Sequence, residues 1–413
     1  MGRTYFDDTW DFRGADTKRF THCFHNYPAI MIPQVAERLL VKYGGNADLV
    51  FDPYCGVGTS LLEANLKGIN SVGTDLNPLA TLVARAKTTK VDIQVLDLYL
   101  KEFKEYLLSI NFDTGTSNVV VPSIKNIDYW FSCSVQKELT LIKEFINGIS
   151  ESSISDFFKV AFSETVRESS WTRNGEFKMF RMSQEQIQKF VPDVFGLMES
   201  KLWRNRKGLK EFVEEANGAV SSVFDFNSVE TIENIEDESV DIVVTSPPYG
   251  DSRTTVAYGQ FSRLANEWLD VENATGIDRE LMGGNACKQN CSFGFEELDW
   301  AVHHIKEKDE KRAKEVKSFY LDYRKSIHNV ANTVKKGGYV CYVVGNRKVK
   351  GIMLPTDEVT RFFFHALGFQ HIETIIRNIP NKRMPSKNSP TNIVGKTDVT
   401  MSNEYIVVMR KRD

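Results

Sequence analysis

The residues most suited to chemistry lie in the stretch 240–250 (VDIVVTSPPYG). A run of β-branched residues predicts a buried strand, and Ser246-Pro247-Pro248-Tyr249 follows it as a stiff turn. Two successive prolines remove two N–H donors, which leaves the Ser246 hydroxyl and the Ser246 and Pro247 carbonyls as acceptors beside the flat ring of Tyr249. Such a tip suits a planar ring that carries an exocyclic amino group. The alternative interpretation is a tight strand-to-loop turn with a packing tyrosine.

A glycine-rich turn earlier in the chain predicts a ligand site. The buried strand 48–52 runs into Pro53-Tyr54-Cys55-Gly56-Val57-Gly58-Thr59, and a helix follows. A strand, a glycine turn and a helix begin a Rossmann-type unit, in which missing side chains let a ligand approach the backbone. The next strand, 71–75, ends in Asp75 roughly 20 positions after the glycines, where such folds hold a carboxylate for ribose hydroxyls. Alternatively, Asp75 caps the helix that opens with Leu76-Asn77-Pro78.

These elements predict one shared cleft. The residue pattern predicts two further strands of this sheet. One covers 221–227 and ends in Asn227, and the other is the strand before Ser246. Because the carboxyl ends of parallel strands meet at one edge of a doubly wound sheet, we expect the glycine turn, Asp75, Asn227 and Ser246 to lie together.

Composition narrows the class of protein. The chain has 413 residues, of which 41% are hydrophobic and 26% charged, as in a soluble globular protein. It shows neither an apolar run of membrane-spanning length nor a signal peptide, so we expect a cytoplasmic protein without a membrane partner. Six scattered cysteines argue against a disulfide scaffold. The net charge of −3 means that any nucleic-acid site must be local.

The order of patterns predicts an interrupted catalytic core. Residues 1–87 form its first half with the ligand turn, and 88–219 read as a helical insertion that could recognise a target sequence. The core then continues in 220–269 and 317–413, and 270–316 form a smaller insertion. Two closing strands follow near the C-terminus.

Basic and aromatic side chains alternate in several of these segments, as a surface that contacts phosphates and bases requires. The alternative is an ordinary solvated surface. The candidate nucleic-acid contacts are Arg173, Lys178, Arg181, Arg204, Arg206, Arg253, Tyr258, Lys382 and Arg383.

No metal site is expected. The best candidate set of zinc ligands is Cys287, Cys291, His303 and His304, but the spacing of these residues departs from zinc-finger and zinc-ribbon patterns. Reduced, unbridged cysteines are the favoured interpretation.

Four stretches together resemble the S-adenosylmethionine-dependent amino-methyltransferases of DNA. Residues 24–40 resemble the N-terminal motif that flanks the cofactor, 52–59 the glycine-rich cofactor motif, 75–78 the ribose motif and 245–249 the catalytic S-P-P-Y motif. The resemblance implies an α/β fold, a Rossmann-like seven-stranded methyltransferase sheet with an antiparallel C-terminal hairpin, here with a largely helical insertion. It also implies S-adenosylmethionine as cofactor. The cofactor residues so implied are Tyr27, Pro28, Asp52, Pro53, Cys55, Gly56, Gly58, Thr59, Asp75, Leu76, Asn77 and Asn227.

The same resemblance implies the reaction. Serine at the first position of the S-P-P-Y motif is typical of enzymes that methylate cytosine N4, whereas adenine N6 enzymes more often carry Asp or Asn there. We expect a site-specific methyltransferase that acts on a flipped base of double-stranded DNA, with Ser246, Pro247, Pro248 and Tyr249 as catalytic residues. A cognate restriction endonuclease is a further expected partner. The alternatives are an adenine enzyme, a tRNA guanine-N2 methyltransferase and a non-catalytic nucleic-acid-binding module.

Overall fold

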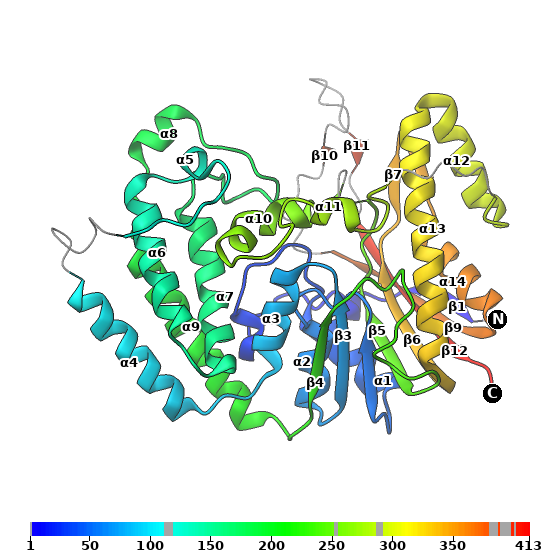
Figure 1. Cartoon of the computed structure of the whole chain (residues 1–413). Coiled ribbons are helices and arrows are strands. Elements are labelled where there is room, and N and C mark those ends of the chain that lie inside the picture. The colour runs from blue at the N-terminus through cyan, green and yellow to red at the C-terminus, as the bar shows by residue number, and fades with distance from the viewer. Residues whose placement is uncertain are drawn as a thin grey trace.

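The centre of the computed structural model is a sheet of eight strands (Figure 1). The structure describes residues 2–110, 119–251, 255–285, 292–379 and 402–413, and the backbone of 387–388 and 398–399. The strands of the sheet are β1 (Arg3–Phe6), β2 (Leu49–Asp52), β3 (Asn70–Asp75), β4 (Ser221–Asp225), β5 (Val240–Thr245), β6 (Val334–Val344), β9 (Phe369–Asn378) and β12 (Asn403–Lys411). They lie in the order β1-β9-β12-β6-β5-β2-β3-β4. Two small pairs stand apart from it, β7 (Arg347–Val349) with β8 (Ile352–Leu354) and β10 (Lys387–Asn388) with β11 (Asp398–Val399).

The strand directions confirm the predicted methyltransferase sheet. Strands β6, β5, β2, β3 and β4 are parallel, and β12 is antiparallel to both β6 and β9. The strand β1 adds an eighth member to the seven that were predicted, because it pairs parallel with β9. Its residues are mostly exposed, so they form no apolar run that would have marked a strand in the sequence.

Helices cover both faces of the sheet. One face carries α1 (Pro33–Tyr43), α2 (Thr59–Leu66) and α3 (Pro78–Thr88), and the other carries α13 (Glu310–Thr333) and α14 (Thr356–Ala366). In α1, proline occupies the first turn and Gly44 follows the last residue, which are residues typical of a helix start and stop. Two short 3-10 helices, η1 (Asp8–Trp10) and η2 (Phe20–Cys23), precede α1.

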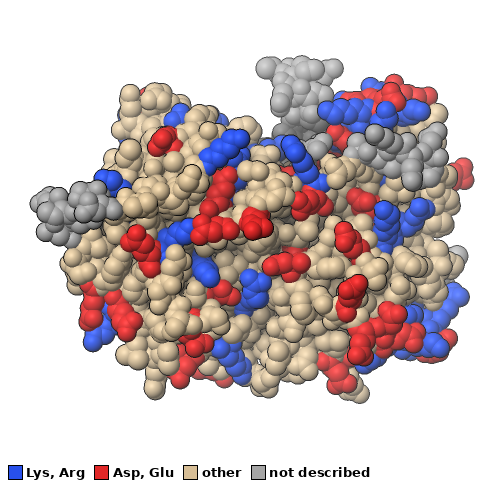
Figure 2. Space-filling view, in the orientation of Figure 1, with Lys and Arg blue, Asp and Glu red and all other residues tan. Residues whose placement is uncertain are grey.

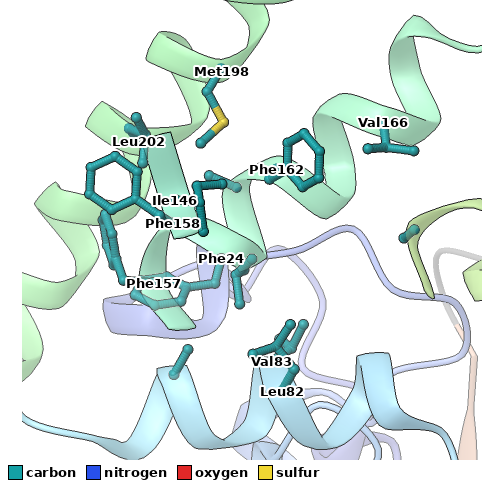
Figure 3. Close-up of a cluster of buried hydrophobic side chains, with 14 of the residues drawn as sticks. Phe24, Leu82, Val83, Ile146, Phe157, Phe158, Phe162, Val166, Met198 and Leu202 are labelled. Atoms are coloured by element: carbon teal, nitrogen blue, oxygen red, sulfur yellow. The ribbon is translucent and has the colours of Figure 1, made fainter. Parts of the chain in front are cut away.

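The part between α3 and β4 is helical, as predicted. It contains α4 (Ile93–Ser109), α5 (Ile127–Trp130), α6 (Cys133–Asn147), α7 (Ser152–Ser169), α8 (Gln184–Lys189) and α9 (Val194–Glu215). A capping box of Ser183 and Gln186 starts α8. Phe157, Phe158 and Phe162 of α7 pack toward α3 in one apolar cluster with Leu82 (Figure 3). The helical part therefore shares a core with the half of the fold that contains the glycine turn and α3, called the cofactor half below.

The second insertion begins after α10 (Tyr258–Trp268) and contains α11 (Ile277–Glu280) and α12 (Glu296–Lys308). Its predicted end at 316 falls inside α13. That helix starts at Glu310, because the Asp309 carboxylate caps it by accepting from the N–H of Arg312 at 3.0 Å.

Candidate active site

The candidate site lies where the chain order of the sheet reverses, between β2 and β5. Val50 faces Ile242 and Phe51 faces Val243, so the ends of the two strands meet. There the Thr245 hydroxyl donates to Asp52 Oδ1 at 2.5 Å. This bond ties the strand before the glycine turn to the strand that carries the S-P-P-Y tip, at the edge where doubly wound sheets bind ligands.

The glycine turn has the backbone that only glycine adopts readily. Gly56 and Gly58 have φ of +49° and +75°, and a Cβ at Gly58 would come within 2.9 Å of the Ala84 Cβ. Gly58 precedes α2 and packs the turn against α3, so it supports the cavity from behind. Thr59 and Ser60, at the N-terminus of α2, line the cavity beside this turn, so a ligand there lies at the end of the helix that favours anions.

Both oxygens of Asp75 are held by backbone groups. Its Oδ2 accepts from the N–H of Gly56 at 3.0 Å, and its Oδ1 accepts from the N–H of Asn77 at 2.9 Å. The cap of α3 is Asn77, whose side chain accepts from the N–H of Leu79. Asp75 is thus aimed at the glycine turn and is not the capping residue of the helix.

A cavity of about 110 Å³ joins the glycine turn to the tip. Its walls include all of the predicted cofactor residues except Gly58, together with Ser246 and Pro248. Five more wall residues lie inside the predicted motifs although none was singled out: Ala29, Ile30, Met31, Tyr54 and Val57. Sequence reasoning missed the remaining ones, which are Ser60, Phe226, Ser228, Leu281 and Met282. Leu281 and Met282 come from the second insertion, so this segment helps to enclose the cavity. No local pattern in the sequence marks them.

The donors and acceptors of this cavity fit S-adenosylmethionine. The Thr59 hydroxyl, at the start of α2, is buried and has no hydrogen-bond partner among the described residues. A hydroxyl and free N–H groups at a helix N-terminus suit a carboxylate, and the Asp75 carboxylate suits ribose hydroxyls. Burial raises the pKa of Asp52 and of Asp75 to about 6, against the hydrogen bonds that each accepts.

Tyr258, predicted to contact nucleic acid, lies instead in the wall of this cavity. Its ring stacks on Tyr27 with centroids 5.9 Å apart and an interplanar angle of 18°. The Tyr27 hydroxyl accepts from Asn77 Nδ2 at 2.8 Å, and the same amide donates to the Ser262 hydroxyl at 3.0 Å. The helix α10, which follows the tip in sequence, is thereby fastened to the ribose motif. Burial raises the pKa of Tyr27 well above its usual value, so its phenol is neutral.

The four residues of the tip have different surroundings. Ser246 and Pro248 line the cavity, and Pro247 is buried beneath them. The Tyr249 hydroxyl donates to Glu404 Oε1 at 2.9 Å. Burial, with the charge of Glu404, raises the pKa of Tyr249 well above its usual value. Sequence reasoning missed Glu404, because it lies 155 positions from Tyr249.

Three of the predicted nucleic-acid residues lie in one arm between α7 and α8. Thr172 and Arg181 form an isolated bridge that closes the arm, which carries Arg173 and Lys178. The Arg181 guanidinium lies over the ring of Tyr129, 4.5 Å from its centroid, and over that of Trp171, at 5.1 Å. The arm also contacts α10, because the N–H of Met179 donates to Gln260 Oε1 at 3.4 Å.

Two other predicted residues, Arg204 and Arg206, are engaged within the protein. Arg204 pairs with the buried Glu164 and donates to the Phe24 carbonyl at 2.7 Å. Arg206 donates to both oxygens of Asp97, at 2.7 and 2.6 Å. We therefore do not retain these two arginines as DNA contacts. Arg253, Lys382 and Arg383 lie outside the described residues.

Known proteins resemble this chain over most of its length. A family profile described as DNA methylase matches residues 240–413. The Type II methyltransferase M.MvaI of Kocuria varians is 39% identical over 97% of this chain and 93% of its own. The chain belongs to the DNA amino-methyltransferases of the N6/N4 family.

Two more distant relatives differ in how much of the chain they match. The Type II methyltransferase M.BsoBI of Geobacillus stearothermophilus is 20% identical over 87% of this chain and 80% of its own. A tRNA (guanine(10)-N2)-dimethyltransferase of Methanocaldococcus jannaschii is 32% identical, but over only 23% of this chain and 29% of its own. The DNA methyltransferases therefore match both the core and the helical part, whereas the tRNA enzyme matches a limited segment.

Two further observations concern metals and membranes. In the part of this DNA methyltransferase that the structure describes, no three His, Cys, Asp or Glu side chains are grouped as metal ligands. His303 and His304 lie on α12, while Cys287 and Cys291 lie outside the described residues. Among the described helices, none has the length and apolar character needed to span a bilayer.

Proposed function

We propose that this DNA methyltransferase acts on specific sites in double-stranded DNA and methylates cytosine N4 after the base has left the helix. Ser246 borders the same cavity as Gly56 and Asp75, and this arrangement carries the proposal. It brings acceptors for an amino group next to a site that suits the methyl donor.

S-adenosylmethionine, when bound, supplies a methyl group on an electrophilic sulfonium centre. Thr59 and the N-terminal N–H groups of α2 would hold its carboxylate, and Asp75 would accept from its ribose hydroxyls. The Tyr27 and Tyr258 rings would cover one side of the pocket. These residues bind and orient, and positioning of this kind supplies much of a rate enhancement.

The S-P-P-Y tip would prepare the target nitrogen. The lone pair of a cytosine N4 is delocalised into the ring, so the nitrogen is a poor nucleophile. The Ser246 hydroxyl and the Pro247 carbonyl can accept from its two hydrogens and hold them out of the ring plane, which frees the lone pair. The same acceptors stabilise the positive charge that the amine carries after transfer, until one of its protons is lost to water.

The free-energy cost of flipping the base out of the duplex would be offset in part by stacking. Removing a base from the duplex costs a few kcal/mol, and stacking on an aromatic ring returns roughly 1–3 kcal/mol. The ring of Tyr249 is the candidate platform. Arg173, Lys178 and Arg181 in the arm beside α10 are the proposed phosphate contacts, together with the predicted Arg253, Lys382 and Arg383.

Cytosine is proposed over adenine because serine occupies the first position of the motif. Adenine N6 methylation is the alternative within the family, and guanine N2 methylation of tRNA is the alternative outside DNA. A restriction endonuclease partner and a cytoplasmic location remain predictions.

The test is to incubate the full chain with tritiated S-adenosylmethionine and either plasmid DNA or tRNA, and to identify the labelled nucleoside. We expect N4-methylcytosine from DNA. Ser246→Ala should lower the transfer rate by about 100-fold or more, because it removes an acceptor used in the transition state, and should leave cofactor affinity unchanged. N6-methyladenine or labelled tRNA would contradict the proposed substrate, and a fully active Ser246→Ala protein would contradict the proposed role of the tip.

A further inference from the structure

A chain of charged groups lies behind the ring of Tyr249. The hydroxyl of Tyr249 donates to Glu404 Oε1 at 2.9 Å, and the other carboxylate oxygen accepts from Arg377 Nη1 at 2.6 Å. The Arg377 side chain is only 4% exposed. Charge-assisted hydrogen bonds of this length are the stronger class in proteins, so the phenol oxygen has a well-defined position.

The N-terminal segment anchors this chain of groups. The Asp11 carbonyl accepts from Arg377 Nη2 at 3.4 Å, and the Asp11 carboxylate accepts from the N–H and the side-chain amide of Asn378, at 2.7 and 3.0 Å. Asn378 in turn is paired with Asn403 across the antiparallel strands. The last residues of β9 and the first of β12 are therefore held together at the edge of the sheet that carries the tip.

From these contacts we propose that Glu404 and Arg377 are positioning residues for methyl transfer, which hold the Tyr249 ring in the orientation that receives the target base. This inference rests on the proposed role of the tip. The prolines fix the backbone before Tyr249 but leave rotation about its side-chain bonds free. The hydrogen bond from the hydroxyl to the Glu404 carboxylate removes that freedom, and Arg377 keeps the carboxylate in place.

A matched control for Glu404 lies on the neighbouring strand β9, which also carries Arg377. Glu373, which is 6% exposed, lies on β9 four residues before Arg377. It also accepts from a tyrosine, Tyr43, and pairs with a lysine, Lys42. These partners belong to the C-terminal end of α1, and not to the tip. Glu373→Gln thus removes the same charge from the same kind of cluster without touching Tyr249.

The experiment compares Glu404→Ala, Glu404→Gln, Tyr249→Phe, the double variant Glu404→Ala/Tyr249→Phe and Glu373→Gln. For each full-length protein, kcat and KM for plasmid DNA and the Kd for S-adenosylmethionine are measured. We expect Glu404→Ala and Tyr249→Phe each to lower kcat by about 10–100-fold with an unchanged cofactor Kd, because a displaced ring misplaces the base. Glu404→Gln should recover part of the activity, since its amide oxygen still accepts from the phenol.

The double variant separates positioning from general damage. If Glu404 acts through Tyr249, the double variant is no less active than either single variant. Glu373→Gln should keep kcat within about twofold of the wild type. The inference is overturned if the kcat decreases of the two single variants multiply in the double variant. It is also overturned if Glu404→Ala has a normal kcat, or if Glu373→Gln lowers kcat as much as Glu404→Ala does. Failure of the proposed function would be recognised separately from failure of this inference. The first shows as a different methylated product of the wild type or as full activity of Ser246→Ala, and neither measurement involves Glu404.

Discussion

At the scale of single residues, the carboxyl group of Asp75, the proposed ligand of the ribose, changes its protonation state near neutral pH. Burial raises its pKa to about 6, the N–H groups of Asn77 and Gly56 lower it, and nearby Asp225 raises it. Without a ligand the group therefore begins to take up a proton as the pH falls toward 6. Ribose hydroxyls donate to the ionised form, so binding of the cofactor favours release of this proton.

Cofactor affinity should consequently fall on acidification. Between pH 8 and about pH 6.5 the Kd for S-adenosylmethionine should change little at this site, and below pH 6 it should rise by up to about tenfold per pH unit. Titration calorimetry from pH 5 to 8 measures this. Asp75→Asn has no carboxyl group to ionise at this position, so it should bind S-adenosylmethionine more weakly and its Kd should not rise in this way below pH 6. An unchanged pH profile in Asp75→Asn would assign the effect to another group.

At the scale of elements, the helical part and the cofactor half depend on one apolar core. Phe158 of α7 is fully buried and packs edge-on against Phe103, with centroids 5.7 Å apart, and near Phe145, at 5.8 Å. The same cluster includes Leu82 and Val83 of α3. Deleting 88–219 would uncover this face of α3, so target recognition by the helical part is better tested by surface substitutions.

Truncation of this core should destabilise the whole chain. Phe158→Ala should lower the free energy of unfolding by about 3–5 kcal/mol, because it leaves a cavity where the ring packs. Denaturant titration followed by circular dichroism measures the change. The matched control is Leu108→Ala on α4, where the side chain is 77% exposed and the cost should stay within about 0.5 kcal/mol. Two separate transitions, with only one shifted, would instead make the helical part an independent domain.

At the scale of the whole molecule, DNA binding must come from local charge. The chain has a net charge of −3, and on the face shown in Figure 2 basic and acidic side chains are interspersed. The arm with Arg173 and Lys178 lies beside α10, the helix that follows the tip. Its position places basic groups near the cleft without a uniformly basic surface.

Removing these two groups should change the salt dependence of DNA binding. For Arg173→Ala/Lys178→Ala, the slope of log K against log salt concentration should become shallower by about 0.9 for each phosphate that the protein no longer neutralises. Fluorescence anisotropy with duplex DNA between about 50 and 200 mM salt, the range over which the phosphate term changes affinity strongly, measures the slope. Lys101→Ala is the control, since Lys101 pairs with Glu105 on the distant α4. A slope equal to that of the wild type would remove the arm from the DNA interface.

The sequence by itself determined the elements whose signals are local. The strand, glycine turn and helix at 48–66, the limits of α1, the capping box of α8 and the closing strands all follow from residues within a few positions of each other. The shared sheet edge also followed, because parallel strands expose their carboxyl ends on one side. These elements can be predicted without knowing which residues meet over long distances in the sequence.

Only the tertiary structure decided which charged and aromatic groups are used inside the protein. Arg204 reads as a phosphate contact in sequence, yet it is paired with Glu164, 40 positions away. Tyr258 reads as a nucleic-acid contact, yet it stacks on Tyr27. Glu404 carries no signal at all, and it meets Tyr249 because β12 inserts between β6 and β9. Such partners are brought together by strand order and packing, which no local spacing encodes.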